Sequence, residues 1–400
     1  MELSFERVEV LLLIASIVAM LARRVGIPYT MGLTLAGIAV ALAHVPPKFE
    51  LTKELIFTTF LPPLIFEAAF HMPWRALRSD LLPVLTLATL GVLVAGAIAA
   101  TGLHFFAAWP WSAAILLAIL ISATDPVSVI ATFKEAGLTG RLRLLVESES
   151  LLNDGTVAVL YSVALAAMAG GGITAIGITS SFLITVAGGI FCGALVGGGA
   201  LLLAGRTDDH LIEITFSTVA AYGSFLLAEH FHLSGVLATL TAGLMIGNMG
   251  SLGSFTDRGH DAVGAFWEYI GFVANSLIFL LIGIRLVMQN IGSVVLVALL
   301  VIALITIGRA VAVYFCCALF ARSSRRISMP HQHILVWGGL RGALALALAL
   351  GLPRDTPYHD AIISISFAVV AFSIIVQGFT MTPLLRRLGE IPAKSATSKI

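Results

Sequence analysis

The sequence predicts an all-α polytopic membrane protein with about thirteen transmembrane helices. Of its 400 residues, 58% are apolar and only 11% are charged, whereas charged residues make up about 25% of a typical soluble chain. The mean hydropathy is +1.01. The apolar runs are continuous and do not alternate with polar residues, which favours helices over barrel strands. These observations exclude a soluble catalytic domain, and the net charge of +1 gives no reason to expect nucleic acid as a partner.

Thirteen apolar runs, separated by charges, prolines and glycines, are each long enough to cross a bilayer at about 20 residues per span. We expect the spans at 8–22, 27–44, 54–70, 81–104, 112–133, 144–169, 175–204, 211–229, 234–249, 266–288, 292–320, 332–350 and 358–385. Because Arg23 and Arg24 follow the first run, we expect a retained helix and not a cleaved secretion signal.

The distribution of Lys and Arg predicts the orientation of the chain. Alternate connections and the C-terminal tail hold sixteen of the 23 basic residues, the other side holds five, and Arg309 and Arg341 lie within spans. Positive residues stay in the cytoplasm, so we expect a cytoplasmic C-terminus and, with an odd number of spans, an N-terminus outside. The expected location is the bacterial inner (plasma) membrane.

Two spans contain features that interrupt a helix. In the fifth span, Pro126 lacks the N–H that would bond the carbonyl of Ser122, so carbonyls near Ser122 and Ala123 need other partners. In the twelfth span, three glycines surround a buried arginine, Arg341; they are Gly338, Gly339 and Gly342. We expect both helices to be broken near the middle of the membrane.

The broken fifth and twelfth spans lie seven helices apart, which predicts two inverted repeats of six helices. The first repeat would comprise residues 1–174, the linking seventh span 175–207, and the second repeat with a short tail 208–400. An odd offset turns the second repeat upside down in the membrane, as in secondary transporters whose site lies between such repeats. In the linking span, Gly189, Gly193 and Gly197 permit close helix contact, either within the subunit or in an expected homodimer.

Four acidic residues lie well inside the spans, where charges usually mark an ion or proton path. They are Glu67, Asp125, Glu149 and Asp154. On a helix, Glu149 stacks with Asn153 and Ser150 with Asp154, because each pair is four residues apart. Oxygen ligands suit a hard alkali cation, and the three cysteines lie in apolar runs, so we expect no cofactor and no resident transition metal.

The four buried acids and the two buried arginines would leave a fully ionised interior with two negative charges. Two carboxylates in one low-dielectric pocket repel each other, so we expect at least one to take up a proton in the physiological pH range. Such a carboxylate can hold a proton or a metal cation but hardly both. This competition is sufficient for exchange if the carrier without a bound ion can reorient only at a high cost in free energy.

Four motifs resemble the sodium/proton exchanger branch of the monovalent cation:proton antiporter family, whose founding bacterial members are called NhaP-type. The motifs occur in the family's order and read FLPPLIFE at 60–67, TDPV at 124–127, ESLLNDG at 149–155 and GGLRG at 338–342. The resemblance extends to the thirteen-helix plan of the whole chain.

The resemblance implies a role for each matching residue. Asp154 resembles the carboxylate for which cation and proton compete, with Asp125 beside it, while Glu149, Ser150 and the carbonyl of Thr124 resemble further sodium ligands. Asn153 resembles the amide associated with one-for-one electroneutral exchange. Glu67 and Arg341 resemble a structural ion pair, and Arg309 resembles a basic partner that offsets acidic charge near the site.

We therefore expect a secondary active sodium/proton antiporter that works by alternating access in the lipid bilayer. A potassium/proton antiporter would use the same carboxylates, and lithium is also compatible with oxygen ligands. A cation channel is a remote alternative, because broken helices do not predict a continuous pore. An intramembrane aspartyl protease is another, because two buried aspartates could share a proton.

Overall fold

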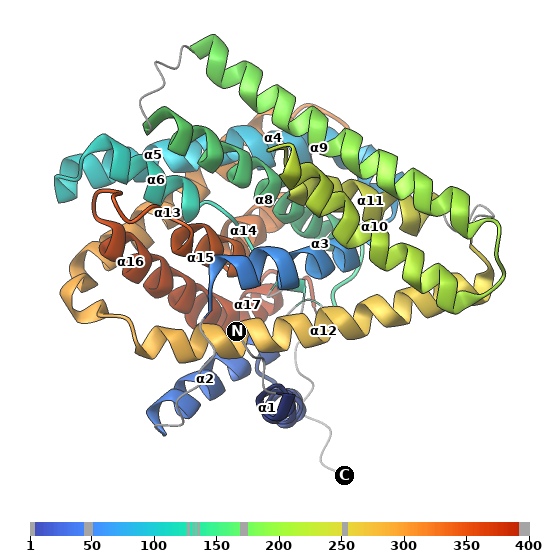
Figure 1. Cartoon of the computed structure of the whole chain (residues 1–400). Helices are drawn as coiled ribbons and strands as arrows, with labels where there is room; N and C mark the ends of the chain where they lie inside the picture. The colour runs from blue at the N-terminus through green and yellow to red at the C-terminus, as the bar shows by residue number, and fades with distance from the viewer. Residues whose placement is uncertain are drawn as a thin grey trace.

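The computed structural model describes residues 5–43, 51–125, 129–130, 133, 137–168, 175–249 and 255–391. Every regular element in these ranges is helical (Figure 1). The elements up to residue 168 are α1 (Phe5–Val25), α2 (Tyr29–Leu42), η1 (Leu55–Phe60), α3 (Leu61–Phe70), α4 (Trp74–Thr86), η2 (Leu87–Gly91), α5 (Val92–Ala107), α6 (Trp111–Leu120) and α8 (Arg141–Met168). The later elements are α9 (Ala175–Ala204), α10 (His210–His230), α11 (Gly235–Met249), α12 (Asp257–Val287), η4 (Ile291–Ser293), α13 (Val295–Leu319), α14 (Met329–Trp337), α15 (Ala343–Leu350), α16 (His359–Phe372), η5 (Ser373–Gln377) and α17 (Gly378–Arg387).

Each of the thirteen predicted spans coincides with helix in the described residues, so the predicted all-α class is confirmed. Seven helices there are long and apolar enough to cross a bilayer by themselves, and shorter apolar helices account for most of the other spans. The fourth span begins earlier than predicted, at Trp74, because Asp80 is neutralised by Arg141 at 2.7 Å and the helix can include charged residues. The tenth begins at Asp257, where the Thr256 side chain caps the helix by accepting from the N–H of Gly259.

The buried side chains form several clusters, and the largest takes residues from α3, α6, α8, α12, α15 and α16. A second cluster lies between α3, α9, α10, α11 and α12 and includes Phe66, Ala221 and Trp267. A third lies between α4, α8, α13, α14 and α17 and includes Leu145 and Val313. The α12 helix runs along the molecule with α2 packed against it (Figure 1). The division into inverted repeats at 1–174 and 208–400 stays a prediction.

The three glycines of the seventh span pack inside the subunit. A Cβ atom on Gly193 would lie 2.2 Å from the carbonyl oxygen of Ala238 on α11, and one on Gly189 would lie 2.7 Å from the carbonyl oxygen of Ser234. Gly197 faces Ala242, which also lies on α11. Only glycine permits this approach of α9 to α11, so contact within the subunit explains the glycine spacing.

Candidate functional site

The two predicted helix breaks lie against each other at the centre of the fold. The helix α6 ends at Leu120, and residues 121–125 continue without regular structure. The helix α14 ends at Trp337, and α15 begins at Ala343. The backbone N–H of Asp125 donates to the carbonyl of Leu340 at 2.7 Å, so a hydrogen bond joins one break to the other. Pro126, the predicted cause of the first break, lies outside the described residues.

Glycines in the second break make room for the charged side chains. A Cβ atom on Gly342 would lie 2.5 Å from both Cβ and Cγ of Asp125. A Cβ atom on Gly339 would lie 2.9 Å from Nε of Arg309, and one on Gly338 would lie 2.8 Å from the carbonyl oxygen of Ile334. The break therefore brings backbone directly against an acid and a base.

Asp154 lies on α8 beside the first break. It shares a cavity of about 30 Å³ with Asp125, Thr124 and Gly342. The aspartate is 5% exposed, and its Oδ1 atom accepts no hydrogen bond from any residue that the structure describes. A buried carboxylate oxygen without a donor is costly, and a proton or a small cation would relieve that cost.

Ser150 connects α8 to the broken segment. Its hydroxyl donates to the carbonyl oxygen of Thr124 at 2.7 Å and lies 3.0 Å from the Thr124 hydroxyl. Both side chains are buried. Hydroxyl and carbonyl oxygens thus lie next to the two aspartates. Within the described ranges, no three acidic, histidine or cysteine side chains converge, so a cation here would need hydroxyl and carbonyl ligands as well as carboxylate.

Glu149, predicted as a further cation ligand, is held by Arg309 of α13. Nη1 and Nη2 of Arg309 lie 2.7 and 2.8 Å from the two carboxylate oxygens of Glu149. The amide nitrogen of Asn153 lies 3.4 Å from Oε1 of the same carboxylate. Both oxygens of Glu149 are therefore occupied, and the residue neutralises an arginine in this structure instead of facing a cation.

The predicted ion pair between Glu67 and Arg341 is wrong. Nη1 of Arg341 donates to the carbonyls of Ser122 and Ala123 at 3.1 and 3.2 Å. Glu67 lies elsewhere, with Oε1 3.7 Å from Nδ1 of His71. The physical reason is that Arg341 caps the carbonyl end of α6, where the helix dipole favours a positive charge. The open carbonyls of the first break were predicted, but not that Arg341 would be their partner.

Two polar residues of the thirteenth span were missed from the sequence. The hydroxyl of Ser373 accepts the backbone N–H of Arg341 at 2.7 Å and donates to Oε1 of Gln377 at 2.8 Å. Both lie in η5, a short π-helical stretch, which is a common feature of functional sites. Two buried polar residues four apart in an apolar run are the signal that could have found them.

Two further cavities lie at opposite ends of α8, one on each side of Asp154. The larger, of about 990 Å³, is polar and includes Glu147, Arg143 and Asp80. The other, of about 200 Å³, includes Tyr161 and Glu229. Glu147 precedes Asp154 by seven residues and Tyr161 follows it by seven, so each cavity ends about 10 Å from the aspartate along the helix.

A sequence model described as "Sodium/hydrogen exchanger, transmembrane" matches residues 11–387. The chain belongs to the sodium/hydrogen exchanger family. The resemblance predicted from the four motifs is thereby confirmed, and the family is one of transporters and not of enzymes.

Several members of the exchanger family are similar over most of their length. The low-affinity Na⁺/H⁺ antiporter NhaS1 of Synechocystis is 38% identical over 371 residues, which are 91% of this chain and 70% of that protein. The Na⁺/H⁺ antiporter NhaH of Halobacillus dabanensis is 33% identical over 399 residues, covering 96% of this chain and 98% of that protein.

The fold of the exchanger family is also found in a solved structure. The sodium proton antiporter MjNhaP1 of Methanocaldococcus jannaschii superposes with a TM-score of 0.79 at 21% identity, covering 98% of this chain and all of that one. This similarity shows the fold. It agrees with the thirteen-helix plan and with a multi-pass membrane protein.

Proposed function

We propose that this chain is a secondary active antiporter that exchanges a sodium ion for a proton, with both ions competing for Asp154. The observation that carries the proposal is the buried Asp154 carboxylate beside Asp125, about midway along α8 between two cavities. A cation or a proton can satisfy its unpartnered oxygen, and each excludes the other by charge. The two antiporters named above, at 38% and 33% identity, support sodium and protons as the substrates.

The charge balance of the site supports one-for-one exchange. Glu149 and Arg309 cancel each other because they form a bidentate pair. Arg341, Asp125 and Asp154 then sum to one negative charge when all are ionised. One bound sodium ion or one proton makes the site neutral, and the neutral amide of Asn153 adds no further titrating charge. We infer electroneutral exchange of one ion for the other.

The proposed sodium ligands are Asp154, Asp125, Ser150 and Thr124, through carboxylate, hydroxyl and carbonyl oxygens. No cofactor beyond the transported ions is part of the proposal. The protein would be a homodimer in the plasma membrane. The distribution of basic residues favours an N-terminus outside and a C-terminus in the cytoplasm. The polar cavity at Glu147 would then open to the cytoplasm.

Proteoliposomes with an imposed proton gradient and a clamped membrane potential provide the test. Sodium uptake should be driven by the proton gradient, carry no net current, and be unaffected by the clamped potential. Potassium and lithium are tested in turn, and uptake of potassium alone would favour the potassium/proton alternative. Sodium flux that does not depend on the proton gradient would favour a channel and contradict the proposal.

A further inference from the structure

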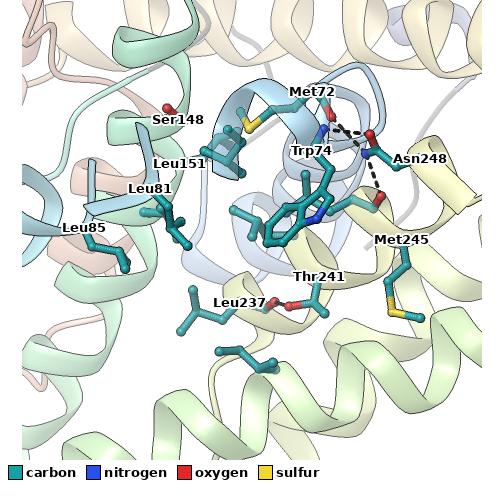
Figure 2. A pocket seen from close by; sticks show the side chains of 15 residues that line it. Met72, Trp74, Leu81, Leu85, Ser148, Leu151, Leu237, Thr241, Met245 and Asn248 are labelled. Carbon is teal, nitrogen blue, oxygen red and sulfur yellow. Dashed lines mark hydrogen bonds between the residues drawn. The ribbon is translucent and has the colours of Figure 1, made fainter. Parts of the chain in front are cut away.

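A further cavity lies between α4, α8, α9 and α11. The cavity has a volume of about 410 Å³, and Figure 2 shows its lining of leucine and methionine side chains around Trp74. It falls within the range of about 300–1,000 Å³ that is typical of ligand sites. A cavity of this size has room for a substantial part of a hydrocarbon chain, since about 150 Å³ is enough for benzene.

The hydroxyl and amide side chains that line this cavity form their hydrogen bonds within the protein. The Thr241 hydroxyl donates to the carbonyl of Leu237, and the Ser148 hydroxyl donates to the carbonyl of Leu144. The side-chain amide of Asn248 donates to the carbonyl of Met72 and accepts a hydrogen bond from the backbone N–H of Trp74, as the dashed lines in Figure 2 show. Water needs polar partners to occupy a cavity, so the chemistry of this cavity favours an apolar occupant.

The cavity is open toward the outer surface of the helices. Trp74, Leu85 and Ile190 line it, and they are 43%, 38% and 45% exposed. In a protein that crosses a membrane, the surface of α4 and α9 at this depth faces acyl chains. An acyl chain can therefore enter sideways from the bilayer without crossing water.

The first turns of α4 also supply a charge next to the apolar opening. Trp74, Leu77, Leu81 and Leu85 form one stripe of the helix at spacings of three and four residues. Arg78 follows Trp74 by one turn, so it borders this stripe, and both Arg75 and Arg78 are exposed. Arginine at a membrane surface attracts anionic headgroups.

We propose that this cavity binds one acyl chain of an anionic phospholipid from the surrounding bilayer, with the headgroup against Arg75 and Arg78. The bound chain would contact both α8 and α11. Leu151 forms a wall both of this cavity and of the cavity at Asp154. The lipid would thus lie one side chain away from the ion site.

Fluorescence quenching by a brominated lipid tests the proposal without measuring transport. The full chain is reconstituted in phosphatidylcholine nanodiscs that contain increasing fractions of phosphatidylglycerol with brominated acyl chains. The contribution of Trp74 is obtained by difference from Trp74→Phe. Trp111, which is 46% exposed and does not line the cavity, serves as the reference for ordinary lipid contact, by difference from Trp111→Phe.

We expect quenching of Trp74 to saturate at a lipid fraction at least tenfold below that needed for Trp111. Leu81→Phe combined with Leu244→Phe narrows the cavity and should raise the half-saturating fraction tenfold or more. Leu82→Phe is the matched control on the same helix, because Leu82 is 52% exposed and does not line the cavity, and it should stay within twofold. The two narrowing variants are also measured singly, so that the test survives if the double variant fails to fold.

The headgroup contact has its own test. Arg75→Gln and Arg78→Gln should each weaken binding of brominated phosphatidylglycerol about fivefold, and neither should change binding of brominated phosphatidylcholine.

Quenching of Trp74 that rises in proportion to lipid fraction, as for Trp111, would overturn the proposal. So would saturation that the narrowing variants leave unchanged. Absence of Trp74 quenching until the protein dissociates into monomers would assign the cavity to a second copy of the chain instead. Equal affinity for the two headgroups would overturn the role of the arginines.

Discussion

Arg309 binds both carboxylate oxygens of Glu149 across the interface between α13 and α8, at 2.7 and 2.8 Å. The two side chains are buried, and Arg309 also donates to the carbonyl of Leu335. A bidentate pair of this kind is fixed in geometry as well as in charge. It removes one acid from the ion site and leaves Asp154 and Asp125 as the carboxylates beside the two helix breaks.

Glu149→Gln should destabilise the protein by about 3–5 kcal/mol, because it leaves the Arg309 charge buried without its partner. Combining it with Arg309→Gln should recover part of this loss, since no unpaired charge remains. Thermal unfolding of the purified protein in detergent measures both effects. Asp360→Asn serves as a control, because Asp360 is paired with His359 but is 99% exposed, and it should leave unfolding unchanged. Equal stability of Glu149→Gln and the wild type would contradict a stabilising pair.

Gly342→Ala should reduce exchange more than tenfold. The new Cβ atom would lie 2.5 Å from Cβ and Cγ of Asp125, so the aspartate must move, and overpacking of this kind costs about 1–3 kcal/mol. Gly199→Ala is the matched control, since a Cβ there meets nothing within 4 Å, and alanine favours a helix by about 1 kcal/mol over glycine. Transport into vesicles and melting temperature are measured for both variants. Normal exchange by Gly342→Ala would show that the close approach is unimportant.

Arg341→Ala should lower the yield of folded protein, because the carbonyls of Ser122 and Ala123 lose their donor. Each unsatisfied buried group costs about 1–3 kcal/mol. Glu67→Gln should change the yield little, since Glu67 does not pair with Arg341 and its side chain is 30% exposed. Size-exclusion chromatography of membrane extracts measures the folded fraction. Equal losses for the two single variants, with no further loss in the double variant, would instead indicate that the two residues act as a pair.

Asp154→Asn should abolish sodium/proton exchange and leave a folded protein, because the amide retains the shape but cannot ionise. Glu147→Gln is the control on the same helix, two turns away in the polar cavity; it should slow exchange without abolishing it. Both are measured in proteoliposomes, with folding checked by thermal unfolding. Proton-coupled sodium flux in the Asp154→Asn protein would argue strongly against the proposed role.

Much of the fold was predictable from the sequence because membrane helices are marked by length and hydropathy alone. Both breaks were also predictable, since proline and clustered glycines weaken a helix wherever they occur. The early start of α4 was not, because its charged first turns depend on Asp80 meeting Arg141, 61 residues away.

The partners of the buried charges were harder to predict. The sequence shows which residues are charged but not which groups they meet, and the open carbonyls at Ser122 and Ala123 compete with carboxylates for the arginines. Glu67 was therefore predicted to pair with Arg341, and Glu149 was predicted to bind the cation, whereas in the structure Arg309 binds both carboxylate oxygens of Glu149. Ser373 and Gln377 were missed because an uncharged hydroxyl or amide group in an apolar run is a weaker indication of a functional site than a charge.

The dependence of sodium affinity on pH tests the central claim most directly. If sodium and a proton compete for Asp154, the apparent KM for sodium should rise about tenfold for each unit by which the pH falls, once the site is mostly protonated. Saturating sodium should displace the proton and restore the maximal rate. Initial rates in proteoliposomes over a range of sodium concentrations, with the same pH on both sides, provide the measurement. A KM for sodium that stays constant across this range would contradict competition at a shared carboxylate.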